Sequence, residues 1–263
     1  MAELGIPNSP LFVARDQRRS KCVCAISPAE TNRILSAHRL YLETDRKQGA
    51  RADFSGIDLS GRSFADMNLR RARFAHALLV GTDFSRANMT RANLIGANLE
   101  RAVLSSANLS NARLNGANLS GAVLDGARFR EADIEFAMLP KAVMAGACLY
   151  GADMSGVILT EAMLCSADLR TANLRGADLH GARLDGADLR EARLGGAFLG
   201  RASLKGADLR GAYLRVAYFE GADLSDADLR DTEGLSEEQL DGVVVNDGTR
   251  LPAGFGKGIR NGP

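Results

Sequence analysis

The sequence is poor in the residues that usually fill or cross-link a globular core. It contains no Trp, its aromatic residues make up only 5%, and its 263 residues include four Cys and six Pro. Four Cys in a chain of this length do not indicate a disulfide scaffold. No apolar run approaches the roughly 18 residues of a membrane-spanning helix. These absences argue against a disulfide-rich secreted domain and against a helical membrane protein.

The chain also lacks an excess of either charge. Lys and Arg together number 33 and Asp and Glu number 32, so the net charge is +1 and provides no global field to attract nucleic acid or an anionic membrane. The first 25 residues show no basic start followed by a long apolar stretch, so we expect no secretory signal and a cytoplasmic protein. Any electrostatic partner must therefore be recognised locally.

A five-residue repeat is what the sequence has in abundance. From Phe54 to Leu229 every fifth residue is large and apolar, at 36 positions without an insertion. Ala lies two residues before the large residue in 31 units, and Gly lies two residues after it in 17 units, where it favours turn geometry. A period of five fits neither an α-helix nor a long strand. It indicates a solenoid in which each unit forms a short edge and a corner, with Ala and the large residue pointing inward.

Segments such as ANLIGANLERAVL and ADLRTANLRGADLHGARLDGADL resemble the A-(D/N)-L-x-x units of the pentapeptide repeat family. The resemblance covers residues 52–231. It implies an all-β solenoid, a right-handed quadrilateral β-helix with four pentapeptides in each coil. On that pattern the 36 units form nine coils of 20 residues. With about 4.8 Å between coils, the rod is about 43 Å long.

Both ends of the rod carry signals for caps. Ser27, Pro28 and Glu30 form a helix start, which predicts an N-terminal capping helix within residues 27–51 that ends near Gln48. A helical spacing of apolar and aromatic residues predicts that one face of this helix covers the first coil, through Ile34, Leu35, His38, Tyr41 and Leu42. Residues 232–263 are interpreted as a short helical cap, which begins at Ser236, and a flexible tail, and we expect residues 1–26 to be mobile.

Residues that could support chemistry do not converge. His38 lies on the expected capping helix, while His76 and His180 fall on different outward stripes, so none forms a pair of metal ligands. Cys22 and Cys24 lack a second pair at zinc-site spacing, and we expect Cys148 and Cys165 to be free thiols. The sequence therefore predicts no catalytic, cofactor-binding or metal site and no cofactor.

Two ladders of opposite charge run along the outside of the last coils. At intervals of 20 the outward positions read Asp168, Asp188, Asp208, Asp228, and two residues further along Arg170, Arg190, Arg210, Arg230. The ladders could either neutralise each other or be presented to a partner. We favour neutralisation, because like charges that repeat every 4.8 Å or so repel each other.

An apolar cluster breaks the polar pattern of the outward positions. Val103, Val123, Val143 and Met163 follow one stripe, and Phe136, Met138 and Ile158 lie around the adjoining edge. Contiguous exposed apolar side chains usually mark a contact. The alternatives are docking of a partner or of a second copy, and coverage by a segment of the chain itself such as the one that contains Leu11, Phe12 and Val13.

Arginines crowd the first coils. Residues 52–131 hold ten Arg against seven acidic residues, and Arg70, Arg71, Arg73 and Arg91 form a candidate basic patch for an acidic partner. A basic end that is simply solvated is the alternative interpretation.

These observations favour a non-enzymatic interaction or scaffold protein of bacterial type, which presents a rigid β-helical surface to a protein partner. The sequence does not identify that partner, and a homodimer is one option. We expect no direct binding of nucleic acid and no membrane span.

The resemblance also implies an alternative, because some pentapeptide repeat proteins protect DNA gyrase from quinolones by imitating duplex DNA. Such a mimic should be strongly acidic, whereas the solenoid holds 21 basic and 22 acidic residues.

Overall fold

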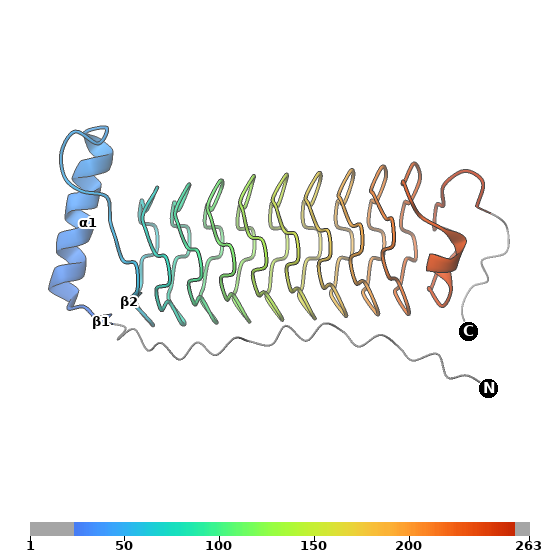
Figure 1. Cartoon of the computed structure of the whole chain (residues 1–263), viewed down its shortest axis with the longest axis horizontal. Coiled ribbons are helices and arrows are strands. Elements are labelled where there is room, and N and C mark those ends of the chain that lie inside the picture. Colours follow the sequence, from blue (N-terminus) through green and yellow to red (C-terminus); the bar gives the residue numbers. More distant parts are fainter. Residues whose placement is uncertain (1–23, 256–263) are drawn as a thin grey trace.

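The computed structural model describes residues 24–255 and shows a straight rod of stacked coils with a helix across one end (Figure 1). Its named elements are β1 (Cys24–Ala25), α1 (Pro28–Glu43), β2 (Ile57–Asp58) and the 3-10 helix η1 (Glu237–Leu240). β1 pairs in parallel with β2. Within the described residues, every helix is too short or too polar to cross a lipid bilayer.

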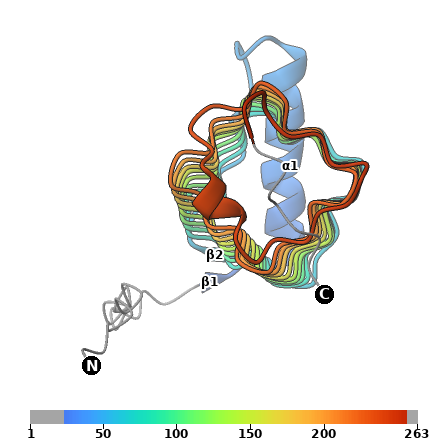
Figure 2. The same ribbon diagram turned by 90° about the vertical axis from the view of Figure 1, so that its right-hand side faces the viewer.

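The coils follow a right-handed quadrilateral β-helix, and the expected fold class is confirmed. Single parallel bridges join residues 20 apart, from the pair Asp53 and Arg73 onward to the pair Tyr213 and Glu233. The successive coils superpose in one four-sided outline when viewed down the rod (Figure 2). The register that the five-residue repeat predicts therefore continues through the whole solenoid.

One coil is held to the next by backbone hydrogen bonds that recur from unit to unit as far as the corner at Gly211. In a representative unit, the N–H of Leu169 donates to Asp188 O (2.8 Å), that of Asp188 to Ala167 O (2.9 Å) and that of Thr171 to Arg190 O (3.0 Å). The N–H of Ala172 closes the corner by donating to Leu169 O (3.1 Å). Thr171 lies at the third position of this β-turn and has a φ of 57°. The equivalent residue has a positive φ in all 36 units, of which 17 have Gly there and 19 do not.

The inward positions form one continuous apolar column. Every large residue of the repeat from Phe54 to Leu229 is at most 1% exposed. In the first two coils the column is aromatic, because Phe54 stacks on Phe74 and Phe64 stacks on Phe84, each with 5.3 Å between ring centroids.

α1 closes the N-terminal end of this column (Figure 2). The side chain of Ser27 accepts a hydrogen bond from Glu30 N (3.1 Å), as the start signal predicts. The buried His38 accepts one from Ala52 N through Nδ1 (3.1 Å). Arg62 occupies an inward position of the first coil, where most units have Ala, and its guanidinium donates to Thr31 Oγ1 and to Ile26 O.

The helix is shorter than expected. It ends at Glu43 and not near Gln48, because Asp45 and Arg46 take positive φ values and turn the chain back toward the rod. At Gly49, with a φ of 73°, a Cβ would lie 2.2 Å from Ala37 O, so only glycine permits this return.

Of the segment 1–26 that we expected to be mobile, residues 24–26 are held by β1 and by Arg62. Residues 1–23, including Cys22 and the stretch with Leu11, Phe12 and Val13, lie outside the described residues, as do residues 256–263 of the expected tail.

The C-terminal end is closed by η1 and the segment after it. Ser236 N donates to Gln239 Oε1 (2.9 Å), in line with the predicted cap. Gln239 in turn donates through Nε2 to Leu214 O (2.9 Å) and Ala217 O (2.7 Å) of the last coil. Bridges from Asp223 to Val244 and from Asp228 to Arg250 add part of a further coil. Side-chain and backbone donors thus satisfy carbonyls that an open solenoid end would leave unpaired.

We expect Leu169→Ala to lower the free energy of unfolding by about 2–5 kcal/mol, because it opens a cavity in the apolar column. The outward change Arg190→Ala removes only a partly exposed ion pair and should lower it by less than about 1 kcal/mol. Chemical denaturation followed by circular dichroism compares the two variants. Equal losses would contradict the inward and outward assignments.

Candidate interaction surfaces

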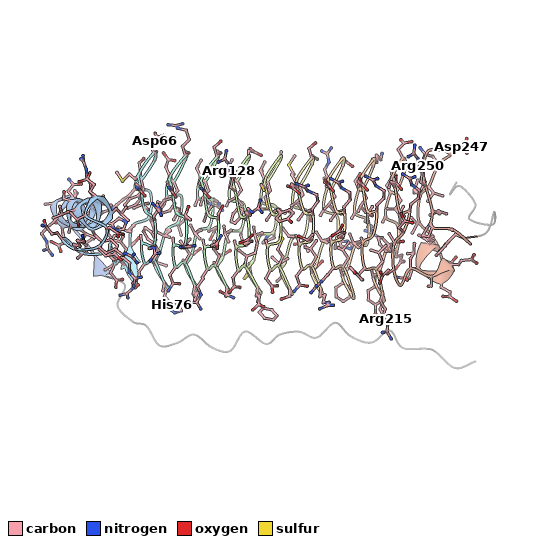
Figure 3. The ribbon with its side chains drawn as sticks, turned by 90° about the horizontal axis from the view of Figure 1, so that it is seen from above. Asp66, His76, Arg128, Arg215, Asp247 and Arg250 are labelled. Atoms are coloured by element: carbon pink, nitrogen blue, oxygen red, sulfur yellow. The ribbon has the colours of Figure 1, made fainter. Side chains whose placement is uncertain are left out.

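The outward residues form four faces that are separated by two-residue corners. We name the faces by their first bridge residue: face 1 from Asp53, face 2 from Asp58, face 3 from Ser63 and face 4 from Asn68, with members 20 residues apart. The corner between two faces is called an edge, so that edge 1–2 holds residues 55–56 and every pair 20 further on. Figure 3 shows His76 and Arg215 of edge 1–2 on the side of the rod opposite to Asp66 and Arg128.

The first half of the predicted apolar cluster lies on face 3. Consecutive bridges join Val103, Val123, Val143 and Met163, so these four side chains, which we call the valine stripe, are direct neighbours on successive coils. The three valines are half-buried by this stacking and Met163 is exposed. The stripe is a continuous apolar band between the polar residues Asp83 and Arg183.

The second half of the predicted apolar cluster lies on face 2 and on the neighbouring edge 1–2. Met138 and Ile158 are bridged neighbours on face 2, and Phe136 occupies edge 1–2 beside them with 67% of its surface exposed. Pro140 and Lys141 form the corner between Met138 and the valine stripe. The structure thus divides the cluster over two adjacent faces.

Face 2 carries further exposed residues that the sequence analysis missed. Phe198 and Tyr218 continue the line of Met138 and Ile158 after Asp178, and their rings stack with 5.1 Å between centroids and 5° between planes. Val216 lies on edge 1–2 next to Tyr218. We call these residues the face-2 strip: Phe136, Met138, Ile158, Phe198, Val216 and Tyr218. Reading every twentieth residue from Asp58 would have found its face-2 members.

The Asp and Arg ladders neutralise each other, as the repulsion argument favours. Each Arg bends back onto the Asp two residues before it and makes a fork of two hydrogen bonds, for example from Arg190 to Asp188 at 2.8 and 2.6 Å. Each Arg except the last also approaches the Asp of the next coil, at 3.5 to 3.9 Å. The hydrogen bonds from Arg230 lower the pKa of Asp228 to about 2, although burial acts in the opposite direction. Asp228 therefore stays charged at neutral pH, and all four aspartates are paired with arginines.

The basic patch is different, because its arginines lack such partners. On edge 4–1 of the first coils, Arg70, Arg71 and Arg91 follow Asn68 and Asn88, which cannot form ion pairs. Among the described residues, no acidic group lies within ion-pair distance of these three guanidinium groups. Arg73 does not share this property, since its Nη1 lies 3.1 Å from Asp53 Oδ2. The free positive charge of this edge therefore belongs to Arg70, Arg71 and Arg91.

A cavity of about 520 Å³ lies between α1 and the first coil, lined by Leu35, Leu42, Met67 and His38 together with polar residues such as Asn32. Burial lowers the pKa of His38, and the charge of Arg51 adds to this effect. Because Nδ1 accepts the Ala52 N–H, the neutral imidazole carries its proton on Nε2, which has no partner within the described residues. His38 thus joins the cap to the first coil and is not paired with a nucleophile.

The remaining candidates for chemistry stay apart. The ring of His76 packs over Gly96 on edge 1–2 and that of His180 over Gly200 on edge 2–3. Cys148 and Cys165 are free and half-buried, each with its Sγ 3.9 Å from an Asp carboxylate. In residues 24–255, no group of three or more His, Cys, Asp or Glu is arranged to hold a metal ion.

Comparisons with known proteins agree with this geometry. The family model of pentapeptide repeats matches residues 52–90, 68–105, 107–146, 156–190, 182–220 and 199–233. Among curated protein sequences, none matches the chain significantly.

Solved structures of similar proteins include two that match most of the chain. HetL, a pentapeptide repeat protein involved in heterocyst differentiation regulation in the cyanobacterium Nostoc sp. strain PCC 7120, is 30% identical over 81% of this chain and 92% of its own, with a TM-score of 0.43. Full-length QnrB1, a plasmid-mediated fluoroquinolone resistance protein, is 21% identical over 74% of this chain and 92% of its own, with a TM-score of 0.53. From the repeats that match along most of its length, we conclude that the chain belongs to the pentapeptide repeat family.

Proposed function

We propose that this protein is a non-enzymatic interaction protein, which uses the outer faces of its rod to bind a protein partner. The observation that carries this proposal is the valine stripe on face 3. The fold places no apolar requirement on outward bridge positions, since face 4 fills the same positions with Asn68, Asn88 and Asn108. An apolar band over four successive coils therefore serves contact and not the stability of the coil.

The rigidity of the scaffold supports the same role. Backbone hydrogen bonds recur at every coil, so the side chains on one face keep a fixed spacing of about 4.8 Å. A partner that matches this spacing meets a surface that needs little ordering on binding, which reduces the entropy lost in the complex.

The arginines without ion-pair partners on edge 4–1 add a second contact area. Arg70, Arg71 and Arg91 offer three guanidinium groups on neighbouring coils to carboxylates of a partner. Further along the same edge, Arg170, Arg190 and Arg210 are already held by aspartates. We infer that an acidic segment of the partner binds the first coils and not the last.

Protection of DNA gyrase is not favoured. The likeness to QnrB1 is at 21% identity and bears on the fold alone. The aspartates of face 4 are covered by arginine forks, so the rod lacks the continuous acidic surface that imitation of DNA needs. A supercoiling assay of gyrase with and without a fluoroquinolone tests this alternative directly.

The valine stripe can be tested by changing Val123 and Met163 together to Asp. We expect the double variant to lose the partners that the native chain captures from its own cells, because charges would enter an apolar contact. A matched control changes Asn173 and Tyr213 of face 1 to Asp, which are also outward and two coils apart and lie away from Arg70, Arg71 and Arg91, and it should keep the partners. Capture followed by mass spectrometry measures both.

An unchanged partner list for the double variant contradicts the assignment of the stripe. If deletion of residues 1–23 alone abolishes capture while the double variant does not, the contact lies in that segment and not in the stripe.

Binding of an acidic partner to Arg70, Arg71 and Arg91 on edge 4–1 can be tested with immobilised poly-glutamate as the probe. We expect retention of the native chain to fall steeply as salt rises, because screening shortens the range of exposed charges to about 8 Å at physiological ionic strength. Changing Arg70, Arg71 and Arg91 to Gln should abolish retention, whereas changing Arg170, Arg190 and Arg210 to Gln should leave most of it. Equal losses in the two triple variants, or retention that ignores salt, would contradict the proposal.

A further inference from the structure

The face-2 strip is a second apolar surface, separate from the valine stripe. Phe136, Val216, Tyr218 and Phe198 are exposed by 67%, 57%, 52% and 48%, more than any residue of the valine stripe. The strip runs from the coil of Met138 to the coil of Tyr218, interrupted only by Asp178 at its centre. Its members are large, and three of them are aromatic.

Two residues of the strip are held in an unfavourable backbone conformation. Phe136 has a φ of 54° and Val216 a φ of 58°, a region that bulky and β-branched residues rarely adopt. On the same edge the intervening coils have glycine at this position, in Gly156, Gly176 and Gly196. In the isolated rod, Phe136 and Val216 are therefore both strained and exposed. Burial against a partner removes the exposure and accounts for large side chains where glycine fits better.

The strip has a twofold pattern about Asp178. One coil to either side lie Ile158 and Phe198, and two coils to either side lie Met138 and Tyr218. Phe136 and Val216 are two coils to either side of Gly176 on edge 1–2. Each apolar residue thus has an apolar counterpart at the same distance from the centre.

The charged residues beside the strip follow the same pattern with opposite signs. On edge 1–2, Glu135 and Arg215 lie two coils to either side of Arg175. On edge 2–3, Glu161 and Arg201 lie one coil to either side of the centre. Lys141 and Glu220, also on edge 2–3, lie two coils to either side at adjoining corner positions, and Lys141 Nζ is 3.5 Å from Glu161 Oε2 within the same copy.

We propose that a second copy of this chain docks on face 2 in antiparallel orientation, with the twofold axis crossing both rods at Asp178. Ile158 then faces Phe198 of the second copy, and Met138 faces its Tyr218. Glu135 meets Arg215 of the second copy, Glu161 meets its Arg201 and Lys141 meets its Glu220. Every one of these contacts occurs twice, which is the property of an isologous interface.

The centre of the interface is compatible with this arrangement. The two Asp178 carboxylates approach each other across the axis, but Arg175 lies on the adjoining edge and has no ion-pair partner among the described residues. Each Arg175 can therefore neutralise Asp178 of the other copy. A parallel dimer would bring Arg215 to Glu220 and Glu135 to Lys141, but it would place Glu161 and Arg201 opposite Ser155 and Gly195. The antiparallel orientation pairs more of the charges.

The overlap covers five coils, about 24 Å of each rod. This is short compared with a standard protein interface, so we expect a reversible dimer whose population rises with protein concentration. Faces 3 and 4 remain free in such a dimer, and the inference is therefore independent of the proposed function.

Exchanging the charges of Glu161 and Arg201 tests whether the two rods are antiparallel. Sedimentation velocity over a series of protein concentrations measures the dimerisation of each variant. The native chain should form a species of about twice the 28.0 kDa chain mass. Glu161→Arg and Arg201→Glu should each weaken dimerisation by about tenfold, and the double variant should restore it. A native chain that stays monomeric up to about 1 mM overturns the proposal, and so does a double variant that is weaker than both single variants.

Glycine substitutions separate dimerisation from folding. Phe136→Gly and Val216→Gly relieve a positive φ, so the folded rod should be at least as stable, while the dimer should weaken about tenfold or more. Glu191→Gly relieves the same strain on edge 4–1 and should leave the dimer unchanged. Dimers of native strength in both strip variants overturn the proposal. The Val123 and Met163 double variant, which tests the proposed function, should still dimerise.

Discussion

The structure depends on one backbone constraint, the hydrogen bond from the corner of each unit to the next coil. The N–H of residues such as Thr171 and Gly176 donates to a carbonyl of the following coil, and the type II-like turn that directs it there has a positive φ at this residue in every unit, whatever residue it contains. The same corner directs Ala and the large residue inward. Three of every five side chains are then left outside on a lattice of fixed spacing. Because the fold does not fix which residues occupy these outer positions, they can be selected for contact with a partner.

Because the outer side chains stack about 4.8 Å apart, the environment of each one is set by its neighbours on the adjacent coils. Three neighbouring valines shield one another, and neighbouring aspartates require arginines between them. On edge 4–1 the result is a rod with two kinds of arginine. Those near the C-terminus are held by forks that lower the pKa values of Asp168, Asp208 and Asp228, while those of the first coils follow asparagines and stay unpaired. For the arginine two residues later, Asp on face 4 supplies the ion-pair partner, as in Asp168 and Arg170, whereas Asn leaves Arg70 without one.

The sequence predicts the parts of this fold that follow from its period. The burial of residues such as Leu169, the start of α1 at Ser27 and the neighbours in the valine stripe all follow from spacing. The end of α1 does not, because positive φ values at Asp45 and Arg46 have no signal in non-glycine residues. The pairing of Arg73 with Asp53 was missed because counting charges along the chain ignores which residues stack 20 apart. Asp178 concealed the face-2 strip by dividing it into two short apolar groups.

Dimerisation through the face-2 strip strengthens partner binding by the valine stripe if the rods pair as inferred. A twofold axis that lies in the plane of face 2 and runs across the rods keeps face 3 of both copies on the same side of the dimer. The two valine stripes then point in one direction, at either end of the overlap. A partner with two binding sites, or an array of partners, would engage the second stripe at the high effective concentration that the first contact creates. A weak apolar band of four residues can then support a stable complex without any further contact on each rod.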